Sequence, residues 1–214
     1  MTEGKKMIKK QVLPLLPLRG LTVFPYMILH FDVGRPKSIE ALEDAMINNQ
    51  LIFLVTQKDV KTDDPKEEDI YRVGTISRIK QLLKLPGNTI RVLVEGISRA
   101  EISQITQLEP FIMSEVTEKV VIEPEYDKVE MEALIRRVHS EFEEYFQLSN
   151  KVSSETLVNV MAIEDPGQLA DIIAANIALK QEDRQEILNQ FDVKLRLEKL
   201  LMILTKEKEI LEVE

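Results

Sequence analysis

The stretch LPLLPLRGLTVFPYMILHFDVGRP, residues 13–36, decides how the first half of the chain folds. Two apolar segments flank a bend built from Pro17, Gly20 and Pro25. Side chains alternate from Tyr26 onward, and those on the face that we expect to be buried are Met27, Leu29, Phe31 and Val33. That period of two predicts a strand with one buried face. Because proline removes a backbone donor and fixes φ, this stretch cannot form a central helix.

The chain up to residue 123 predicts a β-rich domain with one helix. Residues 37–50 place apolar side chains at helical spacing, and Pro36 before them suits a first helical turn. Pro86-Gly87 predicts a type II turn between two strands. The other strands that we expect are residues 51–57, 70–85, 89–105 and 111–123. So many strands in so short a segment favour a compact mixed sheet or a small barrel.

From residue 124 onward the apolar period changes to 3.6, which predicts helices. In the helix expected at 128–148, one apolar stripe holds Val129, Leu134, Val138, Phe142 and Phe146. Further helices are expected at 155–165, 167–179 and 180–191, with Ser153 or Ser154 as an N-cap. The predicted fold class is therefore α+β, with a β-rich domain at 1–123 and an all-α helical bundle at 124–214.

The last predicted helix begins after the N-cap Asp192 and has no stop signal before Glu214. An uncapped helix at this position suggests that the natural chain continues. A short heptad-like seam along this helix consists of Leu197, Leu200, Leu204 and Leu211. One hypothesis is that this seam drives oligomerisation.

Composition excludes several classes of protein. The chain has no cysteine, which excludes disulfides, thiol catalysis and thiolate metal sites. The net charge of −9 lies wholly in residues 125–214, which carry 11 basic and 20 acidic residues. An acidic half with few aromatic side chains makes nucleic acid an unfavoured partner. No apolar run approaches the roughly 20 residues that span a bilayer, and no signal peptide is recognisable, so we expect a cytoplasmic protein without a membrane partner.

The search for catalytic motifs is negative. The glycine spacing fits neither the dinucleotide fingerprint nor the P-loop, and no G-x-S-x-G or S-x-x-K pattern occurs. His30 and His139 are the only histidines, and nothing near either one offers metal-ligand spacing. We therefore predict no catalytic, cofactor-binding or metal-binding residue, and no enzymatic activity, for this chain.

Apolar residues in two exposed-looking places are the strongest functional signal. Consecutive leucines at a strand tip cannot all face one core. The candidate binding residues are Pro25, Tyr26, Met27, Leu82, Leu83 and Leu85. They form either an exposed patch that binds other proteins or a surface that the helical half covers.

Three quoted segments resemble the amino-terminal region of bacterial Lon proteases, close to the Bacillus type. They are LPLRGLTVFPYMILHFDVGRPKSIEALEDAM, VGTISRIKQLLKLPGNTIRVLVEGISRAEI and EDPGQLADIIAANIALKQEDRQEILNQFDVKLRLEKLLMILTKEKEIL. The resemblance implies a PUA-like pseudo-barrel followed by a helical bundle with a long last helix. It also implies a parent ATP-dependent serine protease of the AAA+ class, a ring hexamer acting in protein quality control. ATP, Mg and the Ser-Lys dyad of that parent would lie beyond this chain.

For these residues the resemblance implies recognition of unfolded or degron-bearing proteins and help with hexamer assembly. A dimer of the isolated chain is also conceivable on this view. Two alternatives stay open: a mainly oligomerising, structural domain, and a stand-alone module of the same fold that binds a ligand or a protein.

Overall fold

The structure, a computed structural model, describes residues 6–121 and 126–213. The chain divides into two compact units between Ile122 and Glu123. We call residues 6–121 the β unit and residues 126–213 the helical unit, and we describe each by itself. The described residues form one mixed sheet and six α-helices, which is the α+β class that the sequence predicts.

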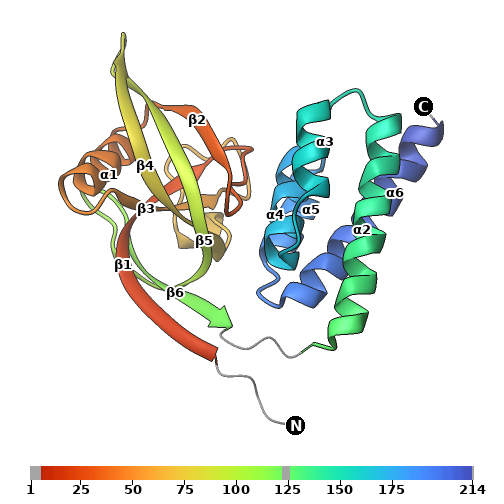
Figure 1. Ribbon diagram of the computed structural model, residues 1–214. Coiled ribbons are helices and arrows are strands. Elements are labelled where there is room, and N and C mark those ends of the chain that lie inside the picture. The colour runs from red at the N-terminus through yellow and green to blue at the C-terminus, as the bar shows by residue number, and fades with distance from the viewer. Residues whose placement is uncertain (1–5, 122–125, 214) are drawn as a thin grey trace. The chain divides into compact units, whose positions relative to one another are not determined.

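The β unit contains six strands, one α-helix and a short 3₁₀ helix (Figure 1). These elements are β1 (Lys6–Leu18), β2 (Ile28–Val33), α1 (Pro36–Ile47), β3 (Leu51–Thr56), η1 (Glu67–Asp69), β4 (Val73–Leu85), β5 (Thr89–Gln107) and β6 (Met113–Val121). The strand order is β2-β5-β4-β3-β1-β6, and β5 also pairs with β6. β5 therefore pairs with β2, β4 and β6, whereas β2 pairs with β5 alone among the described strands.

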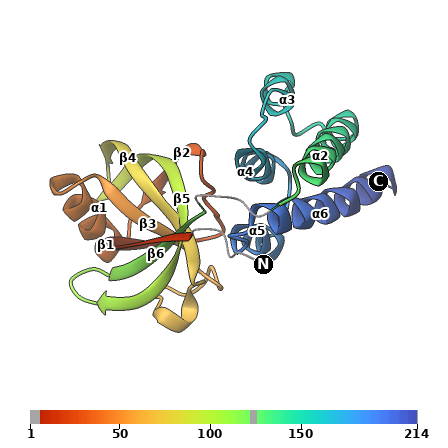
Figure 2. The same cartoon turned by 60° about the horizontal axis from the view of Figure 1, so that its bottom comes forward.

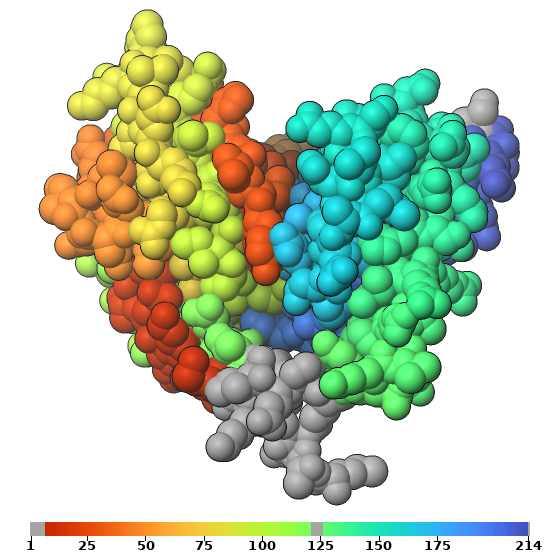
Figure 3. Space-filling model, viewed as in Figure 1, coloured from red at the N-terminus to blue at the C-terminus, as the bar shows by residue number. Residues whose placement is uncertain are grey.

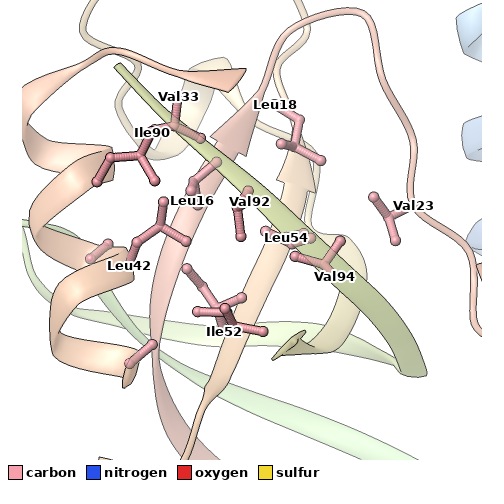
Figure 4. Packing of buried hydrophobic residues seen from close by; sticks show 13 residues of the cluster. Leu16, Leu18, Val23, Val33, Leu42, Ile52, Leu54, Ile90, Val92 and Val94 are labelled. Carbon is pink, nitrogen blue, oxygen red and sulfur yellow. The ribbon is translucent and has the colours of Figure 1, made fainter. Parts of the chain in front are cut away.

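Residues 13–18 of β1 and nearly all of β3 are buried on both faces in the β unit. In β1, Leu13 and Leu15 belong to one core cluster, whereas Leu16 and Leu18 belong to the other. β3 divides in the same way, and its Ile52 and Leu54 join Leu16 in the cluster that α1 covers (Figure 4). This two-sided burial explains why LPLLPL and LIFLVT are continuous apolar runs and do not alternate.

β2 behaves as the alternation predicts. Its exposed residues Ile28, His30 and Asp32 lie on one face, and its other residues face the core. The turn after β4 also agrees with the sequence, because Gly87 has φ +80°. Only glycine adopts that value without strain, and the following Thr89 pairs with Leu85 to close the hairpin.

The helical unit contains five helices. They are α2 (Lys128–Leu148), α3 (Ser154–Met161), α4 (Pro166–Asn176), α5 (Gln181–Leu188) and α6 (Val193–Val213). Side chains cap most of the helix starts: Ser153 Oγ accepts a hydrogen bond from the Thr156 amide at 3.1 Å, and Asp192 Oδ1 accepts one from the Leu195 amide at 2.9 Å. Both N-caps that the sequence predicts are confirmed. The α3 helix is shorter than predicted and ends at Met161.

The predicted apolar stripe of α2 is partly wrong. Val129 is exposed, and Met131 and Tyr145 are buried beside Val138 and Phe142. The rings of Phe142 and Tyr145 stack with centroids 6.5 Å apart. The period was right, but the stripe is rotated because α2 packs against α6, so the partner decides which apolar side chains are covered (Figure 2).

The leucine seam of α6 lies inside the helical unit. Leu197, Leu200 and Leu204 are fully buried, and Leu211 is half-buried. These leucines face α2, α4 and α5, which pack against α6. The sequence hypothesis that they form an interface between chains is therefore wrong for the three buried leucines, since a second folded copy could not reach them.

Candidate functional site

The structure separates the six predicted binding residues into two groups. Pro25 is buried, and Met27 and Leu82 are half-buried against the core of the β unit. The expectation that Pro25 is exposed is therefore wrong, whereas a binding role for Met27 and Leu82 stays a prediction. The remaining residues, Tyr26, Leu83 and Leu85, keep exposed or half-exposed side chains.

The strand register brings the remaining segments onto one face of the sheet. On this outer face Leu83 lies opposite Arg91, Leu85 opposite Thr89, and Leu93 of β5 opposite His30 of β2. Residues opposite one another share a face, and diagonal neighbours lie about 7–8 Å apart. We define the outer patch as the apolar side chains that this register places together: Ile28, Leu83, Leu85 and Leu93.

The outer patch is open to solvent. Ile28 is 66% exposed and Leu83 is 52% exposed, and Leu85 and Leu93 are half-buried. Figure 3 shows the surfaces of β4, β5 and β2 side by side on one face of the β unit. Tyr26, half exposed in the turn before β2, adjoins this surface. Apolar side chains from three strands therefore meet where no described element of the β unit covers them.

The turn that presents Tyr26 is fixed to β5 by main-chain contacts. The Tyr26 amide donates to the Gly96 carbonyl at 2.9 Å, and the Gly96 amide donates to the Met27 carbonyl at 2.8 Å. Tyr26 itself has φ +70°, an uncommon value for a side chain of this size. A Cβ on Gly96 would stand 2.2 Å from the Phe24 carbonyl oxygen, so only glycine allows this close approach.

Two ion pairs lie on the same face among the residues of the outer patch, because Arg91 is opposite Leu83 and Glu95 is opposite Ile28. Arg91 donates to both carboxylate oxygens of Asp32, at 2.7 Å and 3.0 Å, and Lys80 lies 2.5 Å from Glu95. Hydrogen bonding from Arg91 holds the pKa of the Asp32 carboxyl below its usual range. Apolar and charged side chains therefore alternate along this face of β5.

Two clefts of the β unit were not predicted. One, of about 380 Å³, lies between the ends of β1 and β2 and is lined by Leu18, Leu21 and Phe31 among others. The other, of about 300 Å³, is lined mainly by apolar residues such as Leu15 and Ile112. Arg35 borders both clefts, and its guanidinium donates to the Pro17 carbonyl and to Gln57 Oε1. Burial lowers the pKa of Arg35.

Sequence reasoning missed Ile28 and Leu93 as members of the outer patch. The alternation already placed Ile28 on the outward face of its strand, so that signal was present. Alternation likewise places Leu93 on the face of Arg91 and Glu95, but only the pairing of β5 with β2 and β4 shows that Leu93 joins two distant segments.

Several kinds of site find no support among residues 6–121 and 126–213. Within these ranges no three histidine or carboxylate side chains gather as a metal site would require. None of the described helices is both long and apolar enough to cross a bilayer. His30 lies exposed on β2, and His139 Nε2 is 3.1 Å from the Val160 carbonyl in the helical unit.

Comparison with known proteins identifies the family. The family model described as the ATP-dependent protease La (LON) substrate-binding domain matches residues 12–206. A Lon protease of Heliobacterium modesticaldum is 53% identical over 204 residues, which are 95% of this chain and 25% of that protein. Lon protease 1 of Bacillus subtilis is 47% identical over 205 residues, 96% of this chain and 26% of that protein. The chain thus spans about a quarter of the length of these relatives.

Solved structures show the same fold. The N-terminal domain of a Mycobacterium avium complex Lon protease superposes with a TM-score of 0.72 at 20% identity, covering 91% of this chain and 98% of that chain. A Lon N-terminal domain protein from Xanthomonas campestris gives a TM-score of 0.57 at 16% identity, covering 90% and 98%. On the family match and the identity across nearly its whole length, the chain belongs to the Lon substrate-binding domain family.

Proposed function

We propose that this chain recognises unfolded or degron-bearing polypeptides for a longer Lon-type protease. The observation that carries the proposal is the outer patch, four apolar side chains from three strands on the open face of the β unit. Exposed apolar side chains that gather on one face are typical of protein-binding surfaces. The family name, which specifies substrate binding, supports the same function.

In this proposal the chain binds polypeptide substrates and does not cleave them. ATP hydrolysis and peptide-bond cleavage would belong to the other three quarters of a protein like the relatives, and ATP and Mg would bind there. Assembly into a ring is part of the same proposal. The buried leucines of α6 do not support it, so the contacts between subunits would have to lie elsewhere.

A double substitution in the outer patch tests the proposal. We expect Ile28→Ser with Leu83→Ser to weaken binding of a fluorescent, reduced and carboxymethylated test protein about tenfold, because the loss of two partly buried apolar contacts costs about 1–2 kcal/mol. Fluorescence anisotropy measures the affinity, and circular dichroism verifies the fold.

Ile47→Ser is the matched control. Ile47 is 83% exposed at the end of α1 and lies outside the outer patch, so its loss should leave the affinity unchanged. Equal binding by the folded double variant would contradict the assignment of the patch. No binding of any unfolded protein by the unaltered chain would contradict the function itself.

A further inference from the structure

The strand β2 is an open edge of the sheet. It pairs with β5 alone among the described strands, and it ends the strand order β2-β5-β4-β3-β1-β6. Natural proteins protect such edges with proline, lysine or bulges. β2 has no proline, lysine or bulge: its sequence is ILHFDV, its register with β5 is unbroken over six residues, and its one charged side chain, Asp32, is paired with Arg91 of β5.

The main-chain groups on this edge can be assigned from the register. In an antiparallel pair the N–H and C=O of one residue point to the same side, and successive residues point to opposite sides. The Met27 carbonyl accepts from the Gly96 amide, so Leu29, Phe31 and Val33 also direct their groups toward β5. The N–H and C=O groups of Ile28, His30 and Asp32 therefore point to the open edge.

The side chains on either face of this edge are apolar. On the outer face, Ile28 is the residue of β2 that belongs to the outer patch. On the inner face Phe31 and Val33 line the cleft of about 380 Å³ between β2 and the end of β1. An extended chain lying along β2 would direct successive side chains alternately to the outer patch and to this cleft.

We infer that β2 binds polypeptide by strand addition: an extended, unfolded segment pairs with its open edge as a further antiparallel or parallel strand. The main chain of the bound segment forms hydrogen bonds with β2 whatever its sequence. Its apolar side chains, at alternate positions, fill the cleft and cover the outer patch. This inference rests on the proposed function and specifies how the same site binds its polypeptide substrate. It explains how one surface accepts many sequences, since the backbone is common to all of them.

The first arm of the test changes the peptide. The probe is a fluorescent ten-residue peptide of alternating leucine and threonine with terminal lysines. Its partner has the same sequence with N-methyl groups on four consecutive central amides, which removes donors along both peptide edges. We expect the methylated peptide to bind the unaltered chain at least tenfold more weakly, because it cannot donate the main-chain hydrogen bonds that pair it with β2.

The second arm changes the protein. His30→Pro removes one outward N–H without touching a hydrogen bond to β5, and proline is tolerated in an edge strand at such a position. The matched variant His30→Val removes the same side chain and keeps the N–H. We expect His30→Pro to bind the unmethylated peptide at least tenfold more weakly than His30→Val. Circular dichroism verifies both folds, and the peptide arm decides alone if His30→Pro does not fold.

The outcomes separate this inference from the function on which it rests. Equal binding of the two peptides by the unaltered chain would overturn strand addition and leave substrate recognition standing. A dimer that sediments as such and dissociates in His30→Pro would also overturn it, because a second copy would then occupy the edge. Failure of every unfolded protein to bind would overturn both.

Discussion

Gly96 shows how one residue shapes the candidate site. It lies where β5 passes under the turn that carries Tyr26, and both of its main-chain groups bond to that turn. A side chain there would displace the Phe24 carbonyl, which a Cβ would approach to 2.2 Å. The position of the turn on β5, and with it the start of β2, therefore depends on the absence of a side chain.

We expect Gly96→Ala to lower the free energy of unfolding by about 1–3 kcal/mol, the usual cost of forcing an extra methyl into a packed site. Urea unfolding measures this loss. Gly34→Ala is the control, because its nearest atom, Thr89 Oγ1, would be 3.8 Å from the new Cβ. Equal stability of the two variants would show that the turn can move away from β5 at little cost.

The ion pair of Asp32 and Arg91 makes stability depend on pH in a defined direction. Hydrogen bonding from Arg91 lowers the pKa of Asp32 in the folded chain. A lowered carboxyl pKa stabilises the fold above the ordinary pKa, and this stabilisation is lost as the pH falls through the lowered value. Because the pair is exposed, salt also weakens it.

We therefore expect Arg91→Gln to be less stable than the unaltered chain at neutral pH, and the difference to disappear in acid. Urea unfolding at a series of pH values measures it. In an Asp32→Asn background, Arg91→Gln should show no such pH dependence. A difference that persists below the pKa of Asp32 would mean that Arg91 acts through packing and not through its charge.

At the scale of elements, α6 is held by charged side chains inside the helical unit. Arg196 is buried, with Nη1 3.3 Å from Asp171 Oδ2 of α4, and its guanidinium also donates to the carbonyls of Gln190 and Phe191. Further along, Lys208 Nζ lies 2.7 Å from Glu141 and also pairs with Glu144, both on α2. Burial, which lowers the pKa of Lys208, is outweighed by hydrogen bonds to these carboxylates, which raise it.

We expect Arg196→Met to destabilise the helical unit by about 3–5 kcal/mol, because it leaves the Asp171 carboxylate buried beside an apolar side chain. Thermal unfolding followed by circular dichroism measures the loss. Arg136→Met is the control: Arg136 pairs with Glu132 on the exposed face of α2, and such pairs contribute about 0.3–0.5 kcal/mol. A loss as small as the control's would mean that the buried pair does not stabilise α6.

At the scale of the whole molecule, the chain consists of two units with separate cores. The β unit carries the outer patch and the open edge of β2, whereas Leu197, Leu200 and Leu204 of α6 are buried in the core of the helical unit. The sequence hypothesis of an oligomerising seam failed for this reason. Heptad spacing shows that a helix has an apolar stripe but does not show what covers it, and here α2, α4 and α5 do.

The sequence by itself determined the elements of this protein. Alternation identified β2, helical spacing identified α1 and α2, and short polar side chains identified the caps at Ser153 and Asp192, because each of these signals comes from neighbours along the chain. The tertiary structure decided which apolar side chains are exposed. Leu83, Leu93 and Ile28 come onto one surface only through the pairing of β4, β5 and β2, and the turn at Tyr26 approaches β5 only because Gly96 has no side chain. Contacts between residues far apart in the chain leave no local pattern, so the site could be assembled only in three dimensions.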